Sequence, residues 1–283
     1  MCGKLNGARI EVGLPSLVGR SRSKFATLTL IPIKTVGMGK KIIHFAFSPD
    51  PNIVAYCENG STVEILNSQT EKSLVLQAEN RQPRMRFSPD GSLVATGGYG
   101  NSAKVWNVAD GALIHTLDMG GATGGLAVLF SPDGTTVAVG NRNSTTRLFD
   151  AKTGALLQEL NKGSSHGLAF HPSGKTLAIG YVDGSLVLWD VSTGTVRHEV
   201  NTGAEEIYRV DWAPDGRLLA SSGLNTEITI WNGDDLAPLQ TLESPEWVIG
   251  LKFSPDGTRL ITAGGGRQRG SPREVRIWGV AAF

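Results

Sequence analysis

Short apolar segments separated by turn residues dominate the hydrophobic pattern of this chain. The clearest unit has apolar runs at 167–170, 176–180 and 185–190 and a more polar run at 195–200. Glycine, proline and small polar residues fill the gaps between the runs, as tight turns require. Four short strands and three turns within about forty residues predict an antiparallel meander.

The third run of this unit is apolar at consecutive positions and does not alternate with polar residues. Leu186 and Leu188 are predicted to point to one face and Trp189 to the other, because successive strand side chains alternate. Both faces of the sheet are therefore expected to be buried against other parts of the protein. The charged run at 195–200 predicts an exposed outer strand.

A phrase of the type Phe-Ser-Pro-Asp-Gly occurs six times, and its aromatic residues lie 40, 43, 40, 42 and 41 residues apart. The aromatic residues are Phe47, Phe87, Phe130, Phe170, Trp212 and Phe253. In such a turn proline fixes φ, aspartate binds the backbone and glycine takes a positive φ. Pro51 replaces this glycine in the first copy, so a different turn type is expected there. A period near forty with turns at a fixed offset is typical of repeat folds, and covered four-stranded sheets of this kind are propeller blades.

The ends of the third runs carry a family resemblance. They read Trp106-Asn107, Phe149-Asp150, Trp189-Asp190, Trp231-Asn232 and Trp278-Gly279, with a weaker Leu66-Asn67 in the first copy. Together with the turns, residues 42–279 resemble the WD40 repeat family. That resemblance implies an all-β WD40-like β-propeller that acts as a rigid platform for other proteins. The family's Gly-His pair is missing and its buried aspartate is matched only by Asp183, so most of its usual hydrogen-bond network is expected to be absent.

The sixth copy ends after its third strand and lacks an outer strand. Residues 25–33 are predicted to supply it, with Pro32 acceptable on an edge strand, and so to join the two ends of the chain. Six four-stranded blades are therefore expected, in a single domain at 25–283 that follows a flexible basic leader at 1–24. The alternative is seven blades, with residues 8–33 forming a degenerate extra one or with the chain being a fragment of a longer protein.

Composition and charge narrow the function. Hydrophobic residues make up 40% of the chain, and no apolar run reaches the roughly eighteen residues of a membrane span. Two cysteines form no disulfide framework, which favours a reducing compartment and a cytoplasmic location. Residues 1–41 hold eight Lys/Arg and one acid, a net +7, so the rest carries −6. A mildly acidic body argues against nucleic-acid binding.

No catalytic constellation stands out. None of the five histidines is spaced from another ligand as metal sites require, and there is no phosphate loop or nucleophile elbow. We therefore expect a non-enzymatic protein without a cofactor or metal. The alternative is a propeller enzyme, such as a metal-dependent hydrolase with its site in the central channel.

Binding is expected on the rim that carries the loops into each inner strand and the turns between second and third strands. Arginine and the aromatic residues are favoured there because they anchor interfaces. The candidate partner-binding residues are Arg81, Arg84, Tyr99, His166, Tyr181, Tyr208, Trp247, Arg267 and Arg269. Glu205 and Glu206 are expected to form an acidic sector beside the basic one. The predicted partner is a protein or peptide, and the chain is expected to act as a monomer or as a subunit of a larger complex.

Overall fold

The computed structural model describes residues 42–58, 60–78, 81, 83–121, 124–141, 145–265 and 274–280. All of them belong to the compact unit Gly37–Phe283. They contain twenty-four strands and no helix. The predicted leader and the predicted closing strand at 25–33 lie outside the described residues.

The first three sheets follow one another along the chain, and each pairs antiparallel in chain order. The first is Ile42–Phe47 (β1), Ile53–Glu58 (β2), Thr62–Asn67 (β3) and Ser73–Gln77 (β4). The second is Met85–Phe87 (β5), Leu93–Thr96 (β6), Ser102–Asn107 (β8) and Leu113–Asp118 (β9). The third is Gly124–Phe130 (β10), Thr136–Asn141 (β11), Thr146–Asp150 (β12) and Leu156–Leu160 (β13), and β10 also pairs with the short strand Tyr99–Gly100 (β7).

The remaining sheets repeat this order. The fourth is Ser165–Phe170 (β14), Thr176–Tyr181 (β15), Ser185–Asp190 (β16) and Thr195–Asn201 (β17). The fifth is Ile207–Trp212 (β18), Leu218–Gly223 (β19), Glu227–Asn232 (β20) and Pro238–Glu243 (β21). The sixth is Val248–Phe253 (β22), Arg259–Gly264 (β23) and Val275–Gly279 (β24), so its described part has three strands.

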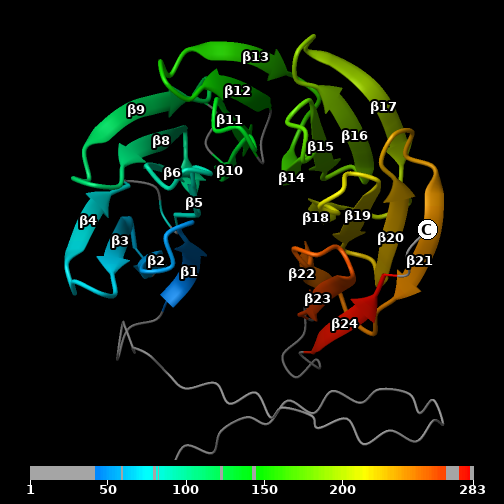
Figure 1. Cartoon of the computed structure of the whole chain (residues 1–283). Coiled ribbons are helices and arrows are strands. Elements are labelled where there is room, and N and C mark those ends of the chain that lie inside the picture. Colours follow the sequence, from blue (N-terminus) through cyan, green and yellow to red (C-terminus); the bar gives the residue numbers. More distant parts are fainter. Residues whose placement is uncertain are drawn as a thin grey trace, which may run out of the picture. The chain divides into compact units, whose positions relative to one another are not determined.

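Consecutive sheets pack through their first strands. β1 contacts β5, β5 contacts β10, and the series continues through β14 and β18 to β22. Figure 1 shows these first strands on the inner side of the sheets and β4, β9, β13, β17 and β21 on the outer side. The outer strands are largely exposed, as the charged run at 195–200 predicted. The meander of each sheet and the all-β class are confirmed.

The core consists of five apolar clusters in the described residues, one between each pair of consecutive sheets. Leu186 and Leu188 belong to the cluster shared with the fifth sheet. Val187 and Trp189 belong to the cluster shared with the third sheet. The prediction that β16 is covered on both faces is therefore confirmed, because each sheet is sandwiched between two neighbours.

Polar bonds also join neighbouring sheets near the start of the inner strands β5 and β22. The buried thiol of Cys57 donates to the Pro83 carbonyl at 3.0 Å, and burial raises its pKa to about 11. The Ser222 hydroxyl donates to the Val248 carbonyl at 3.2 Å. Small polar side chains thus fix one sheet against the next.

The Pro-Asp-Gly turns have the geometry expected from their residues. The glycine of the last five copies has φ between 70° and 77°. In the second copy Asp90 accepts the Ser92 amide at 3.1 Å and the Ser88 hydroxyl at 2.5 Å. The first copy closes instead with the Ile53 amide on the Asp50 carbonyl at 3.0 Å. Its turn differs as predicted, because proline cannot adopt the positive φ of that glycine.

The Trp–Asn/Asp pairs at the ends of the third strands have separate structural roles. The Trp106 indole donates to the Thr96 hydroxyl at 2.9 Å, and equivalent bonds join Trp231 to Ser221 and Trp278 to Thr262. The following Asn or Asp caps the next turn, as Asp190 does by accepting the amides of Ser192 and Thr193. The expectation that most of the family's network is absent was therefore too broad, because its Trp–Ser/Thr part is present in three copies.

Candidate functional site

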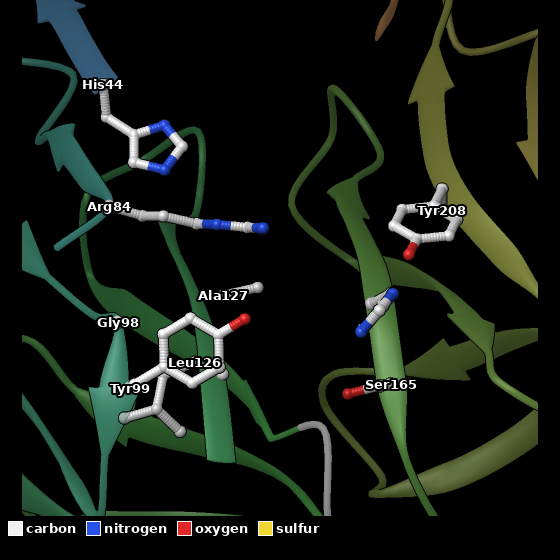
Figure 2. A pocket seen from close by; sticks show the side chains of 10 residues that line it. His44, Arg84, Gly98, Tyr99, Leu126, Ala127, Ser165 and Tyr208 are labelled. Carbon is white, nitrogen blue, oxygen red and sulfur yellow. The ribbon is translucent and has the colours of Figure 1, made fainter. Parts of the chain in front are cut away.

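A cavity of about 180 Å³ opens where the inner strands begin, and five consecutive sheets contribute to its wall (Figure 2). It is lined by His44, Arg84, Gly98, Tyr99, Gly125, Leu126, Ala127, Ser165, His166 and Tyr208. The inner strands start at the same end of their sheets, so residues far apart in sequence meet there. Figure 2 shows Arg84 reaching toward the centre from one side and the Tyr208 hydroxyl facing it from the other.

β-Bulges aim two of these side chains. The pairing register shifts between Ser165 and Gly167 in β14 and between Ile207 and Arg209 in β18. His166 and Tyr208 are the extra residues at these shifts. A bulge leaves one residue unpaired and redirects its side chain. Both side chains line the pocket.

His166 and Tyr208 form one wall of the pocket. Their rings lie 4.9 Å apart between centroids. The imidazole Nδ1 of His166 lies 2.5 Å from the Glu206 carboxylate, which is 8% exposed. Glu206 is therefore buried beside His166, and the expected acidic surface sector of Glu205 and Glu206 is wrong for Glu206.

Tyr99 is an exposed aromatic side chain on a backbone that is held from two sides. Its amide donates to the Arg81 carbonyl at 2.9 Å, and β7 pairs with β10 through Gly125. The side chain remains 53% exposed. A rigid backbone that presents an accessible ring reduces the entropy lost when a partner binds.

The inner strands carry positive charge beside the pocket. Arg84 and Arg86 are exposed to solvent and Arg209 is half-buried. Desolvation and the charges of Arg84 and Arg86 lower the pKa of Arg209 to about 10. Desolvation and the same arginines also lower the pKa of His44. These groups therefore share one electrostatic environment although they come from the first, second and fifth sheets.

One inner-strand carboxylate is neutralised locally. Asp211 lies 2.5 Å from the Lys252 ammonium and accepts the Phe253 amide at 2.7 Å. Burial raises the pKa of Asp211, while Lys252 opposes that shift. This contact joins the fifth and sixth sheets, and the charge of Asp211 also acts on Arg86, whose pKa it raises against the larger effect of desolvation.

The structure brings together four of the nine predicted residues, Arg84, Tyr99, His166 and Tyr208, at one pocket. Arg81 is exposed beside Tyr99, and Trp247 is half-buried just before β22. Tyr181 is 1% exposed within the core, with the Lys162 ammonium 5.5 Å from its ring centroid, so it does not face a partner. Arg267 and Arg269 lie outside the described residues.

Sequence reasoning did not place His44, Ser165 or Arg209 at a binding surface. The sequence does contain a pattern that would have pointed to two of these residues. His44 and Arg209 each lie three residues before the repeated aromatic, as Arg84 does. Comparing the copies at that offset would have found a basic group. Within the described residues, no three His, Cys, Asp or Glu side chains are grouped as a metal site requires. No helix in that part of the chain is long and apolar enough to span a membrane.

Comparisons with known proteins agree with the repeat pattern. The sequence model "WD domain, G-beta repeat" matches residues 83–107, 111–150 and 236–278. That of the "Anaphase-promoting complex subunit 4 WD40 domain" matches residues 158–215. Ribosome assembly protein 4 of Chaetomium thermophilum is 40% identical over 48 residues, which are 17% of this chain and 9% of that protein. The matched segment therefore spans less than a tenth of that relative. With its antiparallel sheets and repeated Trp–Asn/Asp strand ends, the chain belongs to the WD40-repeat family.

Proposed function

We propose that this protein is a non-enzymatic scaffold that binds a protein or peptide partner over the pocket at the start of the inner strands. WD40 domains mediate protein interactions, and the family supports this class of function. The observation that supports this location is the pocket wall, to which four of the five sheets contribute exposed or half-buried polar or aromatic side chains.

The chemistry of the wall suits a partner surface. Tyr99 and Tyr208 offer large amphipathic rings, and such residues anchor interfaces at low entropic cost. Arg84 adds a guanidinium that can bond carboxylate or carbonyl oxygens. The bulges and the β7–β10 pairing hold these groups in place, so binding requires little ordering of the scaffold.

The alternative of a metal-dependent hydrolase is less compatible with this site. Such an enzyme needs oxygen or imidazole ligands around a divalent cation. Here Arg84, Arg86 and Arg209 share one electrostatic environment, and their positive charges repel a cation. The inner-strand carboxylate of Asp211 is already bound to Lys252.

The proposal is tested by identifying what co-purifies with the protein from its native source and measuring that partner's affinity. Tyr99→Ala and Tyr208→Ala should each weaken binding by about 2 kcal/mol, the usual loss at an interface hot spot. Leu239→Ala is a matched control, because Leu239 is 48% exposed on the outer strand β21. Unchanged affinity in both tyrosine variants would show that the partner binds elsewhere.

A further inference from the structure

The first and last sheets of the series each present an apolar face to solvent. On β1 the rings of Phe45 and Phe47, here called the first-sheet face, lie 5.9 Å apart between centroids and are 67% and 70% exposed. On the sixth sheet the side chains of Ile261, Val275 and Ile277, here called the sixth-sheet face, are 41% to 67% exposed. Terminal units of a repeat fold need polar outer faces to remain soluble. Because these two faces are apolar, another surface is expected to bury them.

The two faces use the positions through which consecutive sheets pack inside the chain. Phe47 corresponds to Phe253, which is buried in the cluster between the fifth and sixth sheets. Ile277 corresponds to Ile230, which packs against the same cluster from the fifth sheet. The first-sheet face is therefore of the kind that packs on a preceding sheet, and the sixth-sheet face is of the kind that packs on a following one. The two end faces are complementary in kind.

Side-chain size distinguishes these faces from the junctions inside the chain. Ile277 on β24 pairs with Ile261 on β23. In the first five sheets the residue at the position of Ile261 is a fully buried alanine: Ala55, Ala95, Ala138, Ala178 and Ala220. Phe45 likewise lies where the other five copies have methionine, leucine or valine. Both end faces therefore carry larger side chains than the faces that pack within the chain.

These larger side chains favour contact between separate molecules. Extra methylene groups at a junction of fixed spacing force side chains out of their preferred rotamers. The spacing between two separate molecules is not fixed by the sheets on either side. There the same side chains bury more apolar area and so strengthen the contact. Large residues at both ends thus suit docking in trans better than packing of the first sheet on the sixth within one molecule.

A single added strand does not bury these faces. A strand paired beside β24, as predicted for residues 25–33, lies about 4.8 Å away within the same sheet, whereas a covering sheet lies about 10 Å above the face. Such a strand completes the edge of the sixth sheet and leaves the side chains of Val275 and Ile277 uncovered. The cover must therefore be a second sheet.

We propose that the sixth-sheet face of one molecule docks on the first-sheet face of a second copy of this chain. The contact continues the packing that joins consecutive sheets within the chain. Because each copy carries both faces, the association is head-to-tail and extends beyond a dimer unless it closes into a ring. This surface is separate from the pocket of the proposed function, since none of the residues that line the pocket belongs to either face.

The first test is sedimentation of the purified full chain over a range of concentrations. The wild type should form dimers and larger species as its concentration rises. Phe47→Asp and Ile277→Asp should each weaken self-association about tenfold or more, because each places an unpaired charge in an apolar contact. Val75→Asp is the matched control, since Val75 is 58% exposed on the outer strand β4 of the first sheet. Equal weakening by Val75→Asp would show non-specific association and overturn the inference.

Mixing the two variants tests whether the faces dock on each other. The Phe47→Asp protein keeps an intact sixth-sheet face, and the Ile277→Asp protein keeps an intact first-sheet face. Each variant alone should remain monomeric, whereas an equimolar mixture should form dimers and no larger species, because only one intact junction can form. A mixture that stays monomeric while the wild type associates would overturn the pairing of these two faces.

A wild type that remains monomeric at all concentrations overturns the inference, and the melting temperatures then identify the alternative. Burial of the first-sheet face by the same chain predicts that Phe47→Asp melts lower than Val75→Asp. Burial by a different protein predicts equal melting temperatures for the two purified variants. In both cases the proposed function at the pocket is unaffected, because its test uses Tyr99 and Tyr208.

Discussion

At the scale of single residues, the hydrogen bonding of the third-strand tryptophan in the fourth copy differs from that in the second, fifth and sixth copies. Trp106, Trp231 and Trp278 each donate to a Ser or Thr on the second strand. Trp189 is fully buried, and its indole N–H has no hydrogen-bond partner in the described part of the chain. Ile179 occupies the position of the missing hydroxyl. A buried unsatisfied donor costs about 1–3 kcal/mol.

Ile179→Thr should supply that missing acceptor. The matched control is Ile179→Val, because valine and threonine have the same shape and differ by a methyl in place of the hydroxyl. We expect the threonine variant to be more stable than the valine variant by about 1–2 kcal/mol, since it satisfies the Trp189 indole. At most apolar core positions the valine variant would be the more stable of the two, because the threonine hydroxyl would be buried without a partner. Urea unfolding of both variants measures the difference, and a less stable threonine variant would contradict the assignment.

At the scale of elements, the turns are held by carboxylates that are already committed to hydrogen bonds. The Ser254 hydroxyl and the Thr258 amide donate to Asp256 and lower its pKa to about 2. The Ser192 hydroxyl and the Thr193 amide likewise lower the pKa of Asp190 to about 2. Because both turns depend on an ionised aspartate, the stability of both should fall when that aspartate is protonated.

The pH dependence follows from the sign of these shifts. A carboxylate whose pKa is lower in the folded than in the unfolded state stabilises the fold fully above its unfolded value, and this contribution is lost as the pH falls through the folded value. For Asp256 that window runs from 3.8 down to about 2. Asp256→Asn keeps an acceptor oxygen but cannot ionise. Wild type should therefore lose more stability than Asp256→Asn between pH 4 and pH 2, as measured by urea midpoints. Parallel curves for the two proteins would refute this.

At the scale of the whole molecule, the two ends of the series of sheets differ from its middle. Phe47 is 70% exposed, whereas the equivalent Phe130 and Phe170 are 8% exposed against the sheet before them. At the other end Val275 and Ile277 on β24 are 67% and 49% exposed. Within the described residues β24 pairs only with β23. The first and sixth sheets therefore each expose apolar side chains. The equivalent side chains of the inner sheets are covered by a neighbouring sheet.

The closing strand predicted at 25–33 remains a prediction, and so does the choice between six and seven blades. If residues 25–33 pair with β24, deletion of residues 1–36 should lower the melting temperature by several degrees, since about 1 kcal/mol corresponds to 2–4 °C for a domain of this size. Deletion of residues 1–24 removes only the predicted leader and should leave it unchanged. Equal melting temperatures for the two deletions would exclude closure by this segment.

The local parts of the fold were predictable from the sequence. Turn positions, strand order within each sheet and the opposite faces of Leu188 and Trp189 depend on residues only a few positions apart. Backbone preferences of proline, aspartate and glycine and the two-residue strand period act over that range. Four residues of the pocket also followed from their place on the rim.

The rest depended on contacts between sheets. The burial of Tyr181, the pairing of His166 with Glu206 and the electrostatic coupling of Arg84 to Arg209 join or cover residues from different repeats. Sequence alone determined a series of four-stranded units with specified turns, because those interactions are local. The tertiary structure alone decided which of the rim candidates face the pocket and which, like Tyr181, are buried in the core. Bulge positions and the spacing between sheets are set by packing across the core, and no local pattern encodes those distances.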